Sequence, residues 1–261
     1  MAKIIAITNQ KGGVGKTSTA SALVSGLQEK GYKVLAIDLD PQGNLGFCLG
    51  VENENALTVY ELMKGTANIR RVVQSHNGVD VIPANILLSK AELEFSDFGR
   101  EFLLKKGIAP IKDDYDYIII DTPPALNILT VNAYVATDFL IIPMVPEILS
   151  LMGISQLAET VNLVKGVFNP NIEVLGILLN KYDGRRVLTR DVEEMARMVG
   201  TEMNTKIFKT KIRQSVAVAE APAHGISIYE YSPKSNATKD YRQLVDEIIA
   251  QRGMKVNAKK K

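Results

Sequence analysis

Short apolar segments alternate with longer amphipathic segments along most of the chain. The apolar segments cover residues 3–8, 33–38, 79–83, 117–121, 139–145, 174–180 and 207–212. Most of them carry Ile, Val or Leu on both faces, as parallel strands do when helices cover both sides of the sheet. The pattern therefore predicts seven strands, most of them buried on both faces.

The segments between the strands carry apolar residues at helical spacing. Helices are predicted over residues 16–30, 87–94, 101–112, 129–136, 151–168, 189–199 and 237–252. Gly31 is placed to cap the end of the first helix, and Thr189 to cap the start of the sixth. Strand–helix alternation predicts an α/β fold with a doubly wound, mostly parallel twisted sheet flanked by helices. Residues 42–78 show the weakest pattern.

Composition narrows the class of protein. The 261 residues are 46% hydrophobic and 23% charged, which is typical of a globular protein. Cys48 is the single cysteine, so an internal disulfide and a cysteine-ligated cluster within one chain are excluded. No run of 18 apolar residues occurs and residues 1–7 lack a signal-peptide cleavage site, which predicts a cytoplasmic protein. We expect one domain over residues 1–252 and a basic tail over 253–261.

The strongest motif is a glycine-rich loop between the first predicted strand and helix. It reads Lys11-Gly12-Gly13-Val14-Gly15-Lys16-Thr17 and is followed by Ser18. Glycines let backbone N–H groups face phosphate oxygens, and the helix start adds a positive dipole. Lys16 can reach the β- and γ-phosphates, and the Thr17 hydroxyl can bind Mg²⁺. The alternative is a turn that binds nothing; in G-x-x-x-x-G-K-[ST] the first glycine is replaced by Gln10.

Carboxylates follow two of the predicted strands. Asp38 and Asp40 end one strand, where alternation puts them on one face, and Asp121 ends another. Open α/β sheets bind ligands beyond the carboxyl ends of their strands, so the three side chains are expected near the phosphate loop. Singly, each could be a solvated loop residue. Together they favour a magnesium nucleotide site.

Several segments together resemble the ParA/Soj partition ATPases, within the ParA/MinD class of phosphate-loop ATPases with a deviant Walker A motif. The resemblance covers nearly the whole chain and rests on residues 9–17, 38–44, 81–84, 117–124 and 221–225. It implies a slow, Mg²⁺-dependent ATPase that forms a homodimer with ATP and binds DNA without sequence preference. It also implies a ParB-like partner that stimulates hydrolysis, association with the nucleoid in the ATP state, and segregation of chromosome, plasmid or mobile-element cargo.

The resemblance also implies roles for single residues. Lys11 looks like the signature lysine that reaches the partner's nucleotide, and Lys16 like the phosphate lysine of its own site. Asp40 matches the residue that positions the attacking water. Asp38 and Asp121 resemble residues that hold the waters of Mg²⁺. The remaining expected nucleotide contacts are Gly12, Gly13, Val14, Gly15, Thr17, Ser18, Asn180 as an adenine contact, and Arg213.

The segment expected to contact DNA departs from the family pattern. Relatives commonly carry Ile-Pro-Arg-Asn-Val-Arg where residues 212–217 read Ile-Arg-Gln-Ser-Val-Ala, so an arginine implicated in DNA contact aligns with Ala217. Arg213 could substitute for it. Residues 181–213 hold nine basic and five acidic residues, whereas the whole chain has a net charge of only +2. Arg185 and Arg186 are therefore candidate DNA contacts, although a solvated face explains them equally well.

Two other functions remain open at this point. One is a membrane-surface positioning ATPase of MinD type, which needs an amphipathic C-terminal helix with large apolar residues. Gly253 interrupts the segment where that helix would lie, so no membrane partner is expected. The other is a nucleotide-binding regulator without significant turnover, which the combination of Lys11, Lys16 and Asp40 disfavours.

Overall fold

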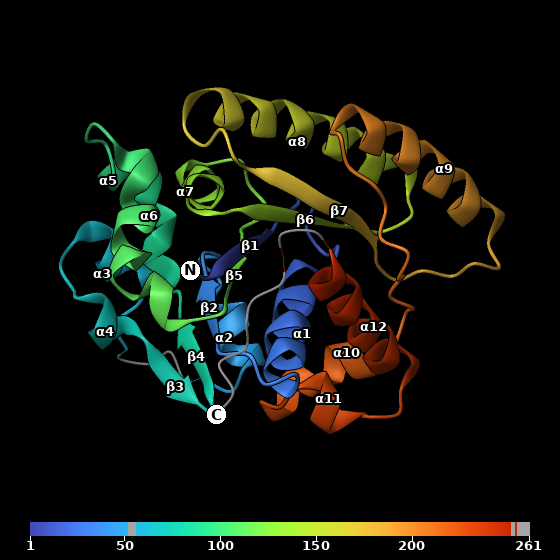
Figure 1. The fold of residues 1–261 in the computed structure, drawn as a ribbon, viewed down its shortest axis with the longest axis horizontal. Helices are drawn as coiled ribbons and strands as arrows, with labels where there is room; N and C mark the ends of the chain where they lie inside the picture. Colours follow the sequence, from blue (N-terminus) through green and yellow to red (C-terminus); the bar gives the residue numbers. More distant parts are fainter. Residues whose placement is uncertain (52–55, 252–253, 255–261) are drawn as a thin grey trace.

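The computed structural model describes residues 1–51, 56–251 and 254, and its strands form one seven-stranded sheet (Figure 1). The strand order is β3-β4-β2-β5-β1-β6-β7, and only β3 runs antiparallel to its neighbour. The strands are β1 (Lys3–Ile7), β2 (Val34–Asp38), β3 (Gln74–His76), β4 (Val79–Ile82), β5 (Tyr117–Asp121), β6 (Phe139–Met144) and β7 (Glu173–Leu179). The predicted α/β, doubly wound, mostly parallel fold is confirmed.

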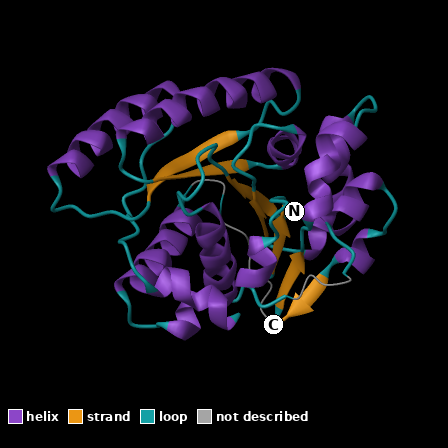
Figure 2. Cartoon of the chain, turned by 180° about the vertical axis from the view of Figure 1, so that it is seen from behind, coloured by secondary structure: helices purple, strands orange, loops and turns teal. Residues whose placement is uncertain are grey.

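Helices cover both faces of this sheet (Figures 1 and 2). One face packs against α1 (Lys16–Glu29), α2 (Asn44–Cys48), α11 (Ile228–Tyr231) and α12 (Asn236–Ala250). The other face packs against α3 (Val59–Lys64), α4 (Ile69–Val72), α5 (Ala91–Glu94), α6 (Leu103–Ile108), α7 (Ile128–Ala136), α8 (Ile148–Val167) and α9 (Val187–Glu202). Two apolar cores thus hold the carboxyl ends of the central strands in fixed positions.

Six of the seven predicted strands are present with ends shifted by no more than one residue, but the strand predicted over 207–212 is wrong. This segment lies beside β7 and forms only isolated bridges, such as Ile177 with Ile207. The backbone N–H groups of Lys209 and Thr210 donate to the carboxylate of Glu247, at 2.8 and 2.9 Å, instead of extending a ladder. A side chain from α12 therefore interrupts the strand that the apolar pattern indicated.

The sequence analysis missed β3, which pairs with β4 as a hairpin. Asn77 and Gly78 form the turn, and both have a positive φ, of 49° and 78°. An Asn-Gly pair is the preferred sequence for such a two-residue hairpin turn. The signal was therefore present inside the region of weakest pattern, but the short polar strand before it carried no apolar alternation.

Several helix boundaries also differ from the prediction. Thr189 does not cap α9, because that helix begins at Val187 after Arg186 and Thr189 is buried within it. Gly31 does follow α1, with a φ of 86°. The helix predicted over 101–112 is divided into a 3-10 turn, α6 and a second 3-10 segment that contains Pro110. The helix predicted over 87–94 likewise divides into a 3-10 segment and α5.

None of the helices in the described part of the chain is long and apolar enough to cross a membrane. Residues 252, 253 and 255–261 lie outside the described residues; they include all of the predicted basic tail except Met254 and most of the segment considered for a membrane helix. The division into a domain of residues 1–252 and a tail stays a prediction.

Candidate nucleotide-binding site

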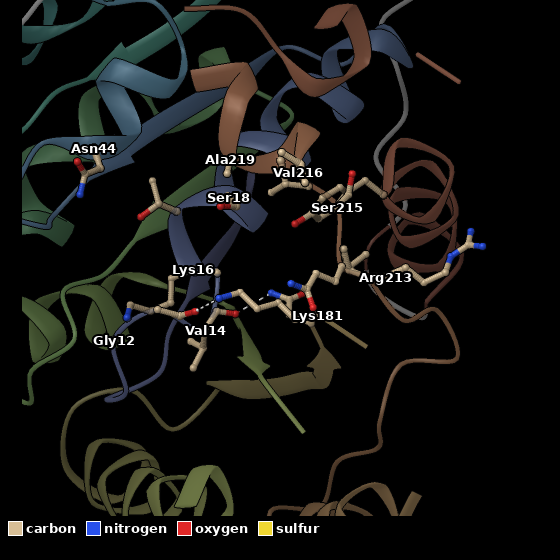
Figure 3. Close-up of a pocket in the computed structure, with 18 of the residues that line it drawn as sticks. Gly12, Val14, Lys16, Ser18, Asn44, Lys181, Arg213, Ser215, Val216 and Ala219 are labelled. Carbon is tan, nitrogen blue, oxygen red and sulfur yellow. Dashed lines mark hydrogen bonds between the residues drawn. The ribbon is translucent and has the colours of Figure 1, made fainter. Parts of the chain in front are cut away.

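A cavity of about 610 Å³ lies at the carboxyl edge of the sheet (Figure 3). Its walls come from the segments that follow β1, β2, β5 and β7, together with a loop that precedes α10 (Ala217–Glu220). The lining residues are Gly12 to Ser18, Asp40, Asn44, Pro124, Asn180, Lys181, Ile212 to Val216, Val218, Ala219 and Tyr241. The structure thus brings the whole predicted phosphate loop after Lys11 together with Asp40, Asn180 and Arg213.

The phosphate loop depends on two glycines in the left-handed region. Gly13 has a φ of 73° and Gly15 a φ of 88°. A Cβ atom on Gly15 would lie 2.7 Å from the Nδ2 atom of Asn180, so a side chain has no room there. Gly15 also stands at the start of α1, where no side chain caps the helix. The first N–H groups of α1 are therefore available to an anion in the cavity.

Lys16 supplies positive charge at the inner end of the cavity. Lys16 is only 7% exposed, and its ammonium group donates to the Lys11 carbonyl at 3.1 Å. Burial lowers the pKa of Lys16, while the carboxylates of Asp121 and Asp40 oppose that change. A buried ammonium with one carbonyl acceptor is well prepared to bind phosphate oxygens.

Asp38 and Asp121 are register partners at the ends of β2 and β5, and both are fully buried. The Asp38 carboxylate accepts from the N–H groups of Asp40 and Leu45, each at 2.9 Å. Neither carboxylate oxygen of Asp121 makes a well-formed hydrogen bond within the described structure. Burial raises the pKa of Asp121 to about 7, although the Thr17 hydroxyl and Lys16 oppose the shift. Burial and the Asp121 charge also raise the pKa of Asp38.

These residues fit an Mg²⁺ ion that keeps much of its water shell. Thr17 lines the cavity, while the unpartnered oxygens of Asp121 lie buried beside it with Asp38. In the described part of the chain no three His, Cys, Asp or Glu side chains gather into a site that could hold a metal by themselves. Mg²⁺ bound with nucleotide commonly has few direct protein ligands, so carboxylates acting through water suit it.

Lys11 is the one predicted phosphate-loop residue that does not line the cavity. Its ammonium group bonds to a Glu147 carboxylate oxygen at 2.5 Å and to the Ser150 hydroxyl at 3.2 Å. Both partners stand at the start of α8 in the same chain. Sequence reasoning missed Glu147 and Ser150. The position of Glu147 just after an apolar strand could have identified it, because the three candidate aspartates also lie at or just after strand ends.

Asn180 ties the end of β7 to the phosphate loop. Its Nδ2 atom donates to the Val14 carbonyl at 2.9 Å and to the Thr19 hydroxyl at 3.2 Å. Its Oδ1 atom is buried with no partner among the described residues, and an adenine amino group is a suitable donor for it. The next residue, Lys181, donates to the Gly13 carbonyl at 3.0 Å. The sequence analysis gave no role to Lys181, although it adjoins Asn180.

The three predicted arginines lie differently. Arg213 belongs to the cavity wall, but its guanidinium is paired with Asp240 and points away from the other lining residues in Figure 3. Arg185 and Arg186 stand outside the cavity in the loop before α9, with side chains 91% and 72% exposed. Both contact Asp183. Direct roles for these arginines on nucleotide or DNA stay predictions.

Comparison with known proteins gives the class and then the family. Residues 2–174 match the family model described as an AAA domain. The chain is 41% identical to the sporulation initiation inhibitor protein Soj of Bacillus subtilis, over 96% of this chain and 99% of that protein. It is 37% identical to the chromosome partitioning protein ParA of Caulobacter vibrioides, over 95% and 94%. The chain therefore belongs to the Soj/ParA family of phosphate-loop ATPases, as its motifs indicated.

A solved structure gives the same fold with its ligands in place. Cobyrinic acid a,c-diamide synthase of Mycobacterium smegmatis, crystallised with an ATP analogue and magnesium, superposes with a TM-score of 0.82 and is 32% identical. The match covers 94% of this chain and 93% of that one. The predicted cofactors, ATP and Mg²⁺, agree with this neighbour.

The buried carboxylates predict a gain in stability when one of them is made neutral. We expect Asp121→Asn to raise the Tm of the nucleotide-free protein at pH 8 by about 5 °C. Unfolded Asp121 ionises near its ordinary pKa, but the folded carboxyl group keeps its proton up to a pKa of about 7. The folded state thus loses stability as pH rises through this window, and the gain should shrink toward pH 4.

Thermal unfolding between pH 4 and pH 8 measures this effect, with Asp97→Asn at an exposed position as the matched control. A change in Tm that is equal at both pH values would contradict the burial argument.

Proposed function

We propose that this chain is an ATP-dependent DNA-partitioning ATPase that closes as a homodimer around ATP. The position of Lys11 carries the proposal. Residues 12–18 line the cavity of their own chain, whereas the Lys11 ammonium group lies at its rim against Glu147 and Ser150. Lys11 therefore does not line the cavity of its own chain, and a second copy facing the rim would bring it to the other nucleotide.

The surface around the cavity supports such a face. Leu126 after β5, Ile148 at the start of α8 and Val216 in the cavity wall are 50%, 58% and 71% exposed. Burying large apolar side chains of this kind stabilises association. Contact between two copies across this rim would cover them and close the cavities to water.

The chemistry needs few protein groups. The N–H groups at the start of α1 and the Lys16 ammonium hold the triphosphate, and Mg²⁺ neutralises phosphate charge when bound. Thr17, with Asp38 and Asp121 acting through water, would hold that ion. Asp40 lines the cavity and orients the attacking water. Lys11 of the second copy then adds positive charge as the phosphoryl group transfers, as an arginine finger does.

DNA binding is assigned to the exposed basic residues near α9. Arg185 and Arg186 are well placed, because their side chains are largely exposed and a single carboxylate, that of Asp183, contacts both of them. Three other cations of residues 181–213 are already paired with carboxylates: Arg197 and Lys211 with Glu193, and Arg213 with Asp240. The resulting surface would contact phosphates without reading sequence. Hydrolysis stimulated by a ParB-like partner would then release DNA.

Loss of the rim lysine should separate hydrolysis from binding. We expect Lys11→Ala to lower the ATP turnover rate by about a hundredfold or more, since a charge supplied in trans is worth that much in phosphoryl transfer. Its affinity for Mg-ATP, measured by equilibrium titration, should change only a few-fold. Lys30→Ala, which removes an exposed ion pair with Asp246 on the surface, is the matched control. Equal loss of affinity and turnover would place Lys11 in its own site instead.

Loss of the water-positioning carboxylate should trap the closed state. We expect Asp40→Ala protein to sediment as a dimer with ATP and as a monomer with ADP, because the triphosphate then persists between the two copies. The wild-type protein under the same conditions provides the comparison. A monomeric Asp40→Ala protein at saturating ATP would rule out the clamp.

Neutralising the two exposed arginines should weaken DNA binding and its salt dependence. We expect Arg185→Ala with Arg186→Ala to reduce the slope of log K against log[salt] by about 1 to 2, since each phosphate contact contributes about 0.9. The matched control is Arg70→Ala with Arg71→Ala on α4, at the other end of the molecule (Figure 1). The salt titration uses the ATP-bound protein.

The same protein, assayed for ATP turnover with DNA and with or without the ParB-like product of a neighbouring gene, tests the complete function. Nucleotide binding without turnover under any of these conditions would instead support a nucleotide-binding regulator.

A further inference from the structure

The cavity wall opposite the phosphate loop is a short segment that has little regular structure of its own. Residues 213–216 supply much of this wall before α10 begins (Figure 3). Gln214 and Ser215 make no hydrogen bond in the described structure. Upstream, the segment is fixed to the end of β7, because the Tyr182 N–H donates to the Ile212 carbonyl at 2.9 Å. Ile212 is therefore anchored directly before residues 213–216.

Arg213 is anchored by a single carboxylate through three hydrogen bonds. Its backbone N–H and its Nε atom donate to Oδ2 of Asp240, at 3.0 and 2.9 Å. Its Nη2 atom donates to Oδ1 of Asp240 at 2.6 Å and to the Asn236 carbonyl at 3.4 Å. Two planar groups paired in this way fix orientation as well as distance. The bond from the Arg213 backbone N–H to Asp240 also fixes the backbone of Arg213 relative to the same carboxylate.

Asp240 belongs to the supporting structure of the cavity. It lies in the first turns of α12, its side chain is 6% exposed, and the next residue, Tyr241, itself lines the cavity. Tyr241 and Leu244 of α12 belong to the same apolar core as Leu23 of α1. The pair thus connects the wall, through one buried carboxylate, to the helix that packs beside the phosphate loop.

We propose that Arg213 and Asp240 form a positioning pair that sets the base-side wall of the cavity, so that Arg213 supports nucleotide binding through the loop and not by touching nucleotide or DNA. The inference rests on the proposed use of this cavity for ATP. Three of the donors on Arg213 are committed to Asp240, and its guanidinium points away from the cavity. Loss of either partner would leave the wall without its anchor, and loss of the arginine would leave a buried carboxylate unpaired.

The test compares two ligands that share the phosphates but not the base. Affinities for Mg-ATP and for magnesium tripolyphosphate are measured on Arg213→Ala, Arg213→Lys and Asp240→Asn proteins. We expect Arg213→Ala and Asp240→Asn to weaken ATP binding about tenfold and to change tripolyphosphate binding less than twofold. Arg213→Lys keeps the charge but not the paired geometry, so it should also lose ATP affinity. The double variant should lose no more than either single one, because both remove one interaction.

Arg242→Ala is the matched control. Arg242 lies on α12, as Asp240 does, and makes a two-point pair with Glu29, but it is not among the residues that line the cavity. It should leave both affinities unchanged. Circular dichroism of each variant checks folding, and Asp240→Asn keeps the shape of the side chain if Arg213→Ala is unstable.

Three results would overturn the pair's role: unchanged ATP affinity, equal losses for ATP and tripolyphosphate, or a loss confined to DNA affinity that Arg213→Lys restores. A wild-type protein that binds ATP but shows no DNA-dependent turnover would instead count against the partitioning function. The role of the Arg213–Asp240 pair would still be decided by the ATP and tripolyphosphate affinities of the variants.

Discussion

The burial of two carboxylates at the ends of β2 and β5 is the constraint on which the site depends. Asp38 and Asp121 face each other across neighbouring strands with no exposed surface, and Asp121 has no well-formed hydrogen bond in the described structure. Two like charges in that position destabilise the folded chain unless protons or a cation compensate them. The fold accepts this arrangement because large apolar cores on both faces stabilise the strands that carry the carboxylates. A cation beside the phosphate loop then finds its partners already in place.

Three lysines lie around the phosphate loop at this carboxyl edge of the sheet, and their ammonium groups have different partners. Lys16 and Lys181 each donate to a carbonyl of the loop, and Lys11 pairs with Glu147. Carbonyl acceptors are weaker partners for an ammonium group than phosphate oxygens are. Binding a triphosphate therefore exchanges weak contacts for strong ones at Lys16, whereas Lys11 must leave a carboxylate before it can act elsewhere. The difference suits Lys16 to phosphate binding in its own site, and it agrees with the role on a second copy that we propose for Lys11.

The sequence predicted the sheet and the phosphate loop well because both depend on local pattern. Apolar runs identified six strands, and glycine spacing identified the loop that Gly13 and Gly15 form. Contacts between distant residues could not be read in this way. Glu247 interrupts the expected strand over 207–212 from 37 and 38 residues away, and Glu147 meets Lys11 from 136 residues away. Such pairs are set by how the elements pack, which periodicity does not encode.

Arg213 shows what the packed structure adds to a motif. On sequence alone it is a cation near a basic segment, and the natural interpretation is a contact with phosphate. The structure supplies Asp240, a nearly buried carboxylate whose charge needs a partner. If Arg213 left this carboxylate to bind DNA or nucleotide, the unpaired buried charge of Asp240 would destabilise the folded protein. An exposed contact between Arg213 and a phosphate would stabilise the complex by much less. The balance of these two free energies favours an Arg213 that remains paired with Asp240 and positions the cavity wall without contacting the ligand.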